Sequence, residues 1–181
     1  MQNNKNMETV AFGGGCFWCS EAVFLNLRGV LSVTPGYAGG SVKNPTYEMV
    51  SSGNTGHAEV ILVEYDPTII TFQKLLEVFF ESHDPTSLNR QGNDVGTQYR
   101  SILLYKTTEQ LREVEEYIKK LTNERKYAKP IVTELVSLND FYPAEEYHKD
   151  YFARHPDELY SENIIKPKVE KIRKEFSKFL K

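Results

Sequence analysis

Both cysteines of the chain lie in one short stretch, and this stretch carries the most reactive chemistry in the sequence. Cys16 and Cys19 flank Phe17 and Trp18, the only tryptophan, and they directly follow three glycines at positions 13–15. A Cys-x-x-Cys pair after such a turn is typical of thiols that react or bind a metal. The pair supports two redox schemes, in which it exchanges disulfides with other proteins or Cys16 attacks an oxidised substrate and Cys19 resolves the product.

The residues around the cysteines predict a strand, a tight turn and a helix that position the thiols. Residues 8–12 are apolar and β-prone, and residues 16–27 have helical apolar spacing without glycine or proline. Cys16 is then expected in the first helical turn, where free N–H groups and the helix dipole favour an anion. For this reason we expect the pKa of the Cys16 thiol to be lowered.

Length and composition predict one ordinary globular domain. The 181 residues are 40% hydrophobic and 26% charged, and the net charge of −3 argues against nucleic acid or an anionic membrane as partner. No stretch reaches the roughly 18 apolar residues of a membrane-spanning helix. The polar start has no apolar signal-peptide core. We therefore expect a cytoplasmic protein with a disordered segment at 1–7 and a catalytic domain at 8–163.

Apolar periodicity predicts an alternation of strands and helices along the rest of the chain. Strands are expected at 30–34, 57–65, 101–105 and 131–138, and helices at 71–82, 108–126 and 143–154. Residues 35–56, with one helical turn near 47–50, and residues 89–100 predict long functional loops. This order predicts an α/β (α+β) two-layer sandwich, with a mixed sheet and a split β-α-β (ferredoxin-like) core.

The end of the chain, residues 164–181, predicts a basic amphipathic helix. It carries seven Lys or Arg against two Glu. Apolar residues recur there at helical spacing, namely Ile165, Val169, Ile172, Phe176 and Phe179. Such a helix can lie on a membrane or bind a partner, but we expect it to pack on its own, oppositely charged domain.

The aromatic residues between the cysteines favour a small oxidised substrate over general disulfide exchange. A general dithiol oxidoreductase usually has small residues or proline at these positions, whereas Phe17 and Trp18 suit a pocket for a small apolar group. A zinc site is disfavoured because it needs two further ligands, and His148 and His155 are spaced more widely than usual. A dithiol–disulfide oxidoreductase, or a module that binds oxidised side chains without turnover, remains an alternative.

Several segments between residues 8 and 155, in matching order, resemble the A class of peptide methionine sulfoxide reductases. They are Gly14–Trp18, Pro35–Gly40, Asn44–Tyr47, Thr55–Glu59, His83–Thr86, Arg90–Asp94, Gly96–Ser101 and Phe141–His148. The resemblance implies reduction of methionine S-sulfoxide, free or in proteins, as a repair of oxidative damage. It implies no bound cofactor, but an external thiol reductant, thioredoxin in this family.

The resemblance also implies a role for each matching residue. Cys16 would attack the sulfoxide sulfur, and Glu59, with a pKa raised by an apolar pocket, would donate a proton to the sulfoxide oxygen. The hydroxyl groups of Tyr47 and Tyr99 would bind the same oxygen. Asp94 would orient the site or the substrate backbone.

The expected substrate pocket contains further residues. Phe17 and Trp18 would surround the terminal methyl group of the substrate, and Tyr37 and His57 are placed in the same substrate-binding set. His57, His83 and His148 are also expected to make structural hydrogen bonds.

The sequence departs from many relatives in its resolving cysteine. Those relatives carry one near the C-terminus, whereas here no cysteine follows Cys19. Cys19 or an external thiol must therefore resolve the Cys16 sulfenic acid. The short separation within one helical turn makes a Cys16–Cys19 disulfide feasible.

Overall fold

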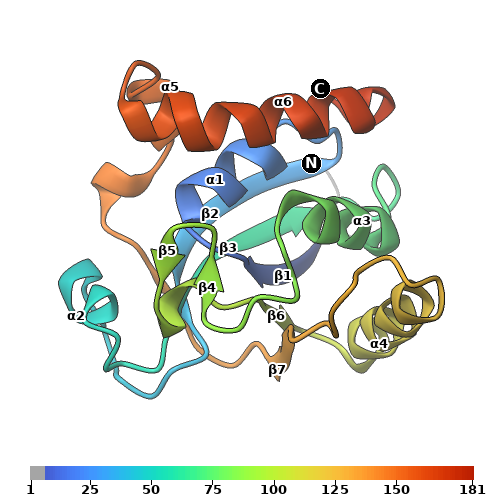
Figure 1. Cartoon of the computed structure of the whole chain (residues 1–181), viewed down its shortest axis with the longest axis horizontal. Coiled ribbons are helices and arrows are strands. Elements are labelled where there is room, and N and C mark those ends of the chain that lie inside the picture. Colours follow the sequence, from blue (N-terminus) through green and yellow to red (C-terminus); the bar gives the residue numbers. More distant parts are fainter. Residues whose placement is uncertain (1–6) are drawn as a thin grey trace, which may run out of the picture.

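The structure, a computed structural model, describes residues 7–181 (Figure 1). Its strands are β1 (Glu8–Gly13), β2 (Val30–Ala38), β3 (Ala58–Tyr65), β4 (Arg90–Gln91), β5 (Asp94–Val95), β6 (Ile102–Tyr105), β7 (Glu134–Ser137) and β8 (Phe141–Pro143). Its α-helices are α1 (Phe17–Phe24), α2 (Tyr47–Ser51), α3 (Phe72–Ser82), α4 (Thr108–Asn123), α5 (Tyr151–Arg154) and α6 (Lys166–Glu175). A π-helical turn, Ser161–Ile165, leads directly into α6.

One six-stranded mixed sheet forms the centre of the molecule. Its strand order is β7-β6-β1-β3-β2-β8, and all neighbours are antiparallel except β6 and β7. Helix α1 connects β1 to β2, and β3 lies between these two strands. The short strands β4 and β5 form a separate hairpin beside the sheet. The expected mixed sheet with helices is confirmed.

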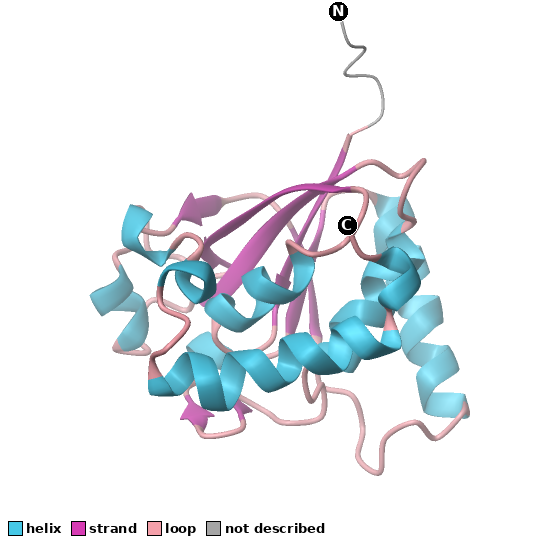
Figure 2. Cartoon of the chain, turned by 90° about the horizontal axis from the view of Figure 1, so that it is seen from above, coloured by secondary structure: helices cyan, strands magenta, loops and turns pink. Residues whose placement is uncertain are grey.

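Helices cover one face of the sheet, and a smaller apolar cluster lies on the other (Figure 2). Alternation along β1 shows the division, because Val10 and Phe12 belong to the large cluster under the helices and Ala11 belongs to the small one. Phe79 of α3 and Phe24 of α1 pack against Phe12, with ring centroids 4.8 and 5.1 Å away. This core fixes α1, and therefore both cysteines, above the central strands.

Threonine caps set the beginnings of two helices close to where the sequence predicts them. The Thr71 hydroxyl accepts the Lys74 N–H at 3.1 Å, and α3 begins directly after it. For α4 the cap is Thr107, which accepts the Gln110 N–H, and the helix begins at the predicted residue, Thr108. Each cap of this kind stabilises a helix by about 1 kcal/mol.

The predicted break after residue 34 is wrong, because β2 continues through Ala38. Strand β8, which the sequence does not predict, pairs with Gly36, Tyr37 and Ala38 and keeps this stretch extended. Tyr37 thereby becomes the direct neighbour of Glu59 on β3 and of Tyr142 on β8. The extension brings a predicted site residue next to the predicted acid.

The helix predicted at 143–154 is also wrong for most of its length. Pro143 ends β8, a single 3-10 turn spans Glu146–His148, and only Tyr151–Arg154 is helical. Asp150 interrupts the helix with a left-handed backbone, φ 52°. Its N–H donates to the Glu21 carboxyl group of α1 at 3.0 Å, which ties this segment to the helix that carries the cysteines.

Helix α6 lies across α1 and α3 (Figure 1). The apolar residues of α6 and of the positions that flank it are at most 8% exposed and belong to the large cluster, namely Ile165, Val169, Ile172 and Phe176. The division into a catalytic domain at 8–163 and an added helix stays a prediction. The disorder predicted for residues 1–7 falls outside the described residues, apart from Met7.

Candidate active site

Cys16 is the N-cap residue of α1, one position earlier than a first-turn residue. Gly15 before it has φ +90°, a conformation that side chains rarely adopt, and its N–H donates to the Tyr99 carbonyl oxygen at 3.2 Å. A Cβ atom added to Gly14 would lie 2.8 Å from the His83 ring. These two glycines therefore let the turn bring Cys16 close to the loop that carries Tyr99.

The expected lowering of the Cys16 pKa is wrong, because burial has the largest effect on this pKa. Cys16 is 7% exposed, and desolvation raises the pKa of its thiol well above the ordinary value, with further contributions from Glu59 and Cys19. A hydrogen bond from the Trp18 backbone amide acts in the opposite direction but is weaker. The helix N-terminus favours a thiolate here, but it does not outweigh the loss of water.

Glu59 lies on β3 with its carboxyl group beside the start of α1. It is 1% exposed, and its Oε2 accepts the Phe17 N–H at 3.1 Å. Burial raises the pKa of Glu59 to about 8, and the nearby Asp94 charge adds to this effect. A group with this pKa is largely protonated at neutral pH, so it is able to donate a proton.

Tyr47 and Tyr99 belong to two separate segments, and both phenols interact electrostatically with Glu59 and Cys16. Tyr47 begins α2, Tyr99 ends the 3-10 turn Thr97–Tyr99, and both side chains are half-buried. Burial raises the pKa of both phenols, and the charges of Glu59 and Cys16 raise each of them further. Both hydroxyl groups therefore lie near Glu59 and Cys16 and stay protonated as hydrogen-bond donors.

Trp18 is the partly exposed aromatic residue beside Cys16, and Phe17 lies behind it. The Trp18 indole N–H donates to His148 Nδ1 at 3.0 Å, and the Trp18 ring stacks on Tyr151 with centroids 3.7 Å apart. Phe17 is 1% exposed and contacts the rings of Trp18 and His148. Only Trp18 of the pair is therefore open to a ligand in this state, while Phe17 supports it.

A chain of hydrogen bonds connects Cys19 to Asp94 through Tyr160. The Tyr160 hydroxyl donates to Asp94 Oδ2 at 2.9 Å and lies 4.0 Å from Cys19 Sγ. The same hydroxyl interacts with Cys16, where it lowers the pKa of the thiol. Asp94 is therefore linked to both cysteines through the Tyr160 hydroxyl. Its carboxylate orients this hydroxyl.

Tyr37 is a buried support of the site. It is fully buried, and its hydroxyl donates to Glu145 Oε1 at 3.3 Å. Glu145 Oε2 accepts the backbone N–H of Tyr47 at 3.2 Å. The Tyr37 hydroxyl is thus engaged with Glu145, which in turn fixes the start of α2.

His57 contacts the loop that follows β2. Its Nδ1 accepts the Gly40 N–H at 3.0 Å, and its Nε2 lies 2.7 Å from the Val42 carbonyl oxygen, as a donor in this tautomer. Both ring nitrogens are occupied, so the ring braces a loop and has no polar atom left for a substrate. His83 is similarly engaged by Phe79 and Ser101.

Three residues of the site have no role predicted from the sequence, namely Glu145, Tyr151 and Tyr160. His148 is predicted to make a structural hydrogen bond, and in the structure its partner is the Trp18 indole N–H. Glu145 and His148 lie in the segment Phe141–His148, which carries the resemblance, so a signal exists for them. Tyr151 and Tyr160 have none, because nothing in their local sequence separates them from the other nine tyrosines.

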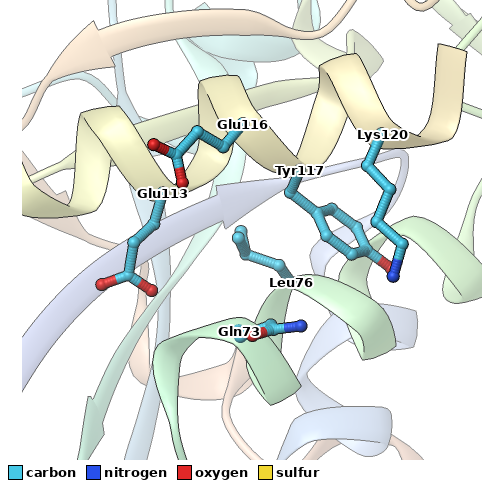
Figure 3. A pocket seen from close by; sticks show the side chains of 6 residues that line it. All are labelled: Gln73, Leu76, Glu113, Glu116, Tyr117 and Lys120. Atoms are coloured by element: carbon cyan, nitrogen blue, oxygen red, sulfur yellow. The ribbon is translucent and has the colours of Figure 1, made fainter. Parts of the chain in front are cut away.

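One cavity of the protein lies away from this chemistry. A cavity of about 190 Å³ between α3 and α4 is lined by Gln73, Leu76, Glu113, Glu116, Tyr117 and Lys120 (Figure 3). It contains no predicted site residue. Within residues 7–181, no group of three or more His, Cys, Asp or Glu side chains is arranged to hold a metal. No helix in that range has the length and apolar character to cross a membrane.

The chain is similar to peptide methionine sulfoxide reductases along nearly its whole length. The sequence model of the family "Peptide methionine sulfoxide reductase" matches residues 8–180. The MsrA protein of Sulfolobus acidocaldarius is 56% identical over 94% of this chain and 96% of its own length. That of Haloquadratum walsbyi is 56% identical over 96% of this chain and 98% of its own length.

Solved structures share the fold. Reduced Mxr1 from Saccharomyces cerevisiae has a TM-score of 0.79 and 31% identity over 88% of this chain and 91% of its own. Mxr1 in complex with Trx2 has a TM-score of 0.57 and 24% identity over 82% of this chain and 88% of its own. With the family match at residues 8–180, these likenesses establish that the chain belongs to the peptide methionine sulfoxide reductase family and is an oxidoreductase.

Proposed function

We propose that this protein reduces methionine S-sulfoxide, free or in proteins, through a sulfenic acid on Cys16 that Cys19 resolves to a disulfide. The observation that carries the proposal is the buried Glu59 carboxyl group, largely protonated at neutral pH and bonded to the Phe17 amide directly after Cys16. A proton donor beside a thiol is the combination that reduction of a sulfoxide requires. Membership of the family supports the same substrate class.

In the first step, Glu59 protonates the sulfoxide oxygen, and the hydroxyl groups of Tyr47 and Tyr99 stabilise it. The substrate sulfur becomes electrophilic, and Cys16 attacks it as the thiol proton passes to the Glu59 carboxylate, which restores the acid. The oxygen passes to the Cys16 sulfur, which loses two electrons, and the substrate sulfur gains them. Methionine leaves, and Cys16 remains as a sulfenic acid. While Glu59 is protonated it carries no charge to oppose formation of the thiolate.

In the second step, the Cys19 thiol condenses with the sulfenic acid. A bond forms between the two sulfur atoms, the Cys16 S–O bond breaks, and water leaves. Cys19 is one helical turn from Cys16, and its N–H donates to the Cys16 carbonyl oxygen at 3.2 Å. Because no further cysteine follows Cys19, it is the intramolecular partner that the chain offers.

The disulfide is then reduced by an external dithiol, for which we propose thioredoxin. Two successive thiol–disulfide exchanges return both cysteines to thiols and leave the reductant as a disulfide. The support is indirect, since yeast Mxr1, 31% identical to this chain, has been crystallised with Trx2. The cytoplasmic location stays a prediction from the sequence.

The central strands support the finer fold assignment that we propose, a split β-α-β core of the ferredoxin-like kind. The order β6-β1-β3-β2 places β3 between β1 and β2, and β1 between β3 and β6. Helices α1 and α3 follow β1 and β3 in the chain. In this arrangement α1 presents the cysteines at one end of the sheet.

One assay tests the proposal against its alternatives. The protein is incubated with a peptide that contains either the S or the R epimer of methionine sulfoxide, with dithiothreitol as reductant. We expect methionine to form from the S epimer only. A general dithiol oxidoreductase would reduce a protein disulfide but neither epimer, and a binding module would convert neither substrate. Retained turnover in Cys16→Ser would contradict the assigned nucleophile.

A further inference from the structure

A small cavity lies against Cys19, between α1, α3 and α6. It is lined by Gly14, Cys19, Ser20, Val23, Ser82 and Lys168. Of these residues, Lys168 carries the only positive charge. It belongs to α6, the basic helix whose charge the proposed reaction does not use. The cavity therefore brings Lys168, from the last helix of the chain, beside the residue that would resolve the sulfenic acid.

Lys168 differs from its neighbour Lys171 in how its charge is compensated. Lys168 is half-buried, and no carboxylate lies within 4.0 Å of its Nζ among residues 7–181. Lys171, almost one turn later, donates to the Glu81 carbonyl oxygen at 2.7 Å and lies 3.7 Å from Glu81 Oε2. A partly buried cation without a carboxylate partner is available to interact with an anion inside the fold.

The other charged groups around Cys19 oppose a thiolate. Burial raises the pKa of the Cys19 thiol, and the charges of Asp94 and Glu59 raise it further. Lys168 is the strongest influence in the opposite direction, followed by the Tyr160 hydroxyl. On its other side, Lys168 borders a second cavity, of about 400 Å³, whose titratable lining residues are Glu81, His83, Asp84, Tyr127 and Lys171.

We propose that Lys168 is a positioning residue for the resolving step, and that its ammonium group stabilises the Cys19 thiolate across the shared cavity. The proposal rests on the resolving role proposed for Cys19. Cys19 must lose its proton to attack the sulfenic acid. The thiolate then forms the sulfur–sulfur bond as the Cys16 S–O bond breaks, and the leaving hydroxide takes up a proton to give water. Lys168 stays protonated throughout and touches no substrate atom.

The first test isolates Cys19 in the Cys16→Ser background. Alkylation of Cys19 by iodoacetamide is measured as a function of pH in this protein and in versions that add Lys168→Met, Lys168→Arg or Lys171→Met. We expect Lys168→Met to move the midpoint to higher pH and to lower the thiolate fraction at neutral pH by roughly three- to tenfold. Lys168→Arg should restore the midpoint. Lys171→Met, with the same change of charge, should leave it in place.

The midpoint of the alkylation rate against pH distinguishes an effect of the Lys168 charge from an effect of its packing. A change in access to Cys19 alters the alkylation rate equally at all pH values, whereas a change in the pKa moves the midpoint. Circular dichroism checks the fold of each variant, and Lys168→Gln replaces the Met variant where that one is unstable. The same midpoint in Lys168→Met and the parent protein would overturn the proposal, as would an equal shift in Lys171→Met.

A second measurement uses proteins that contain both cysteines. It distinguishes a failure of the proposed function from a failure of the role proposed for Lys168. A single turnover without reductant is followed by methionine release and by disulfide formation. We expect Lys168→Met to release methionine at the normal rate and to form the disulfide roughly three- to tenfold more slowly below the thiol pKa, as the thiolate fraction predicts. If no variant forms a disulfide, Cys19 is not the resolving residue. Normal disulfide formation in Lys168→Met would contradict the role of Lys168.

Discussion

The carboxyl group of Glu59 lies 3.1 Å from the backbone nitrogen of Phe17, whose N–H it accepts, and Phe17 directly follows Cys16. This bond joins the start of β3 to the first residue of α1. It holds a carboxyl group with a raised pKa beside the thiol, and within residues 7–181 no cationic side chain forms a salt bridge with Glu59. The acid and the nucleophile of the proposed reaction are therefore positioned by backbone structure.

Glu59→Gln should keep the fold and slow sulfoxide reduction by roughly 10²–10⁴-fold, because an amide accepts the Phe17 N–H but donates no acidic proton. Wild-type activity should fall as the pH rises through about 8, where Glu59 loses its proton. Steady-state rates across pH provide the measurement. A Gln variant that keeps both the rate and the alkaline decline would assign the acid to another group.

The same pKa shift predicts a dependence of stability on pH. The folded-state pKa of Glu59, about 8, lies above its ordinary value, so the folded chain retains a proton that the unfolded chain releases. Wild-type stability should therefore decline between about pH 4.5 and pH 8. Relative to wild type, Glu59→Gln should gain on the order of a few kcal/mol over this range. Urea unfolding at several pH values measures this gain, with the exposed Glu48→Gln as control.

His148 should control the orientation of Trp18. Burial lowers the pKa of His148, so the ring is neutral and its Nδ1 accepts the indole N–H. His148→Phe leaves that N–H without its acceptor, at a cost of about 1–3 kcal/mol. We expect a shifted emission of Trp18, the only tryptophan, and a larger change in KM than in kcat. Trp18→Phe lacks the donor, so adding His148→Phe to it should change KM little further. If KM instead changes as much as in the wild-type background, the Trp18–His148 hydrogen bond is excluded as the cause.

The packing of α6 should contribute to global stability. Ile172 is 2% exposed in the large core cluster, and Ile172→Ala should destabilise the fold by about 2–5 kcal/mol and lower the melting temperature. The exposed Glu170→Ala on the same helix is the matched control. A melting temperature equal to that of the control would show that α6 is not part of the cooperative core.

Local sequence predicts the elements that carry the site, since strand, glycine turn and helix around Cys16 follow from short-range preferences. It does not predict contacts between distant segments. Asp94 and Tyr160 are 66 residues apart, and their hydrogen bond depends on how α6 and the β4–β5 hairpin pack. The helix predicted through residue 150 has a suitable pattern, but Glu21 of α1 takes the Asp150 N–H and stabilises a different backbone.

The Cys16 pKa shows that local sequence also fails to predict electrostatic effects that depend on distant segments. A helix N-terminus is visible in the sequence and predicts a lowered pKa. The burial of Cys16 and its proximity to Glu59 and Cys19 become visible only in the fold. Together they raise the Cys16 pKa instead of lowering it. The raised pKa of Glu59, in contrast, is expected from an apolar pocket, and the structure shows that burial is its largest cause.

Mass spectrometry of the oxidised protein tests the central claim most directly. Wild type and Cys19→Ser are each given excess methionine sulfoxide without reductant and then a dimedone-type reagent. We predict that wild type releases methionine and ends as a Cys16–Cys19 disulfide without a dimedone adduct. Cys19→Ser should also release one equivalent but stop as a sulfenic acid that dimedone traps on Cys16. A dimedone adduct on wild type, or normal cycling of Cys19→Ser with thioredoxin, would contradict the account.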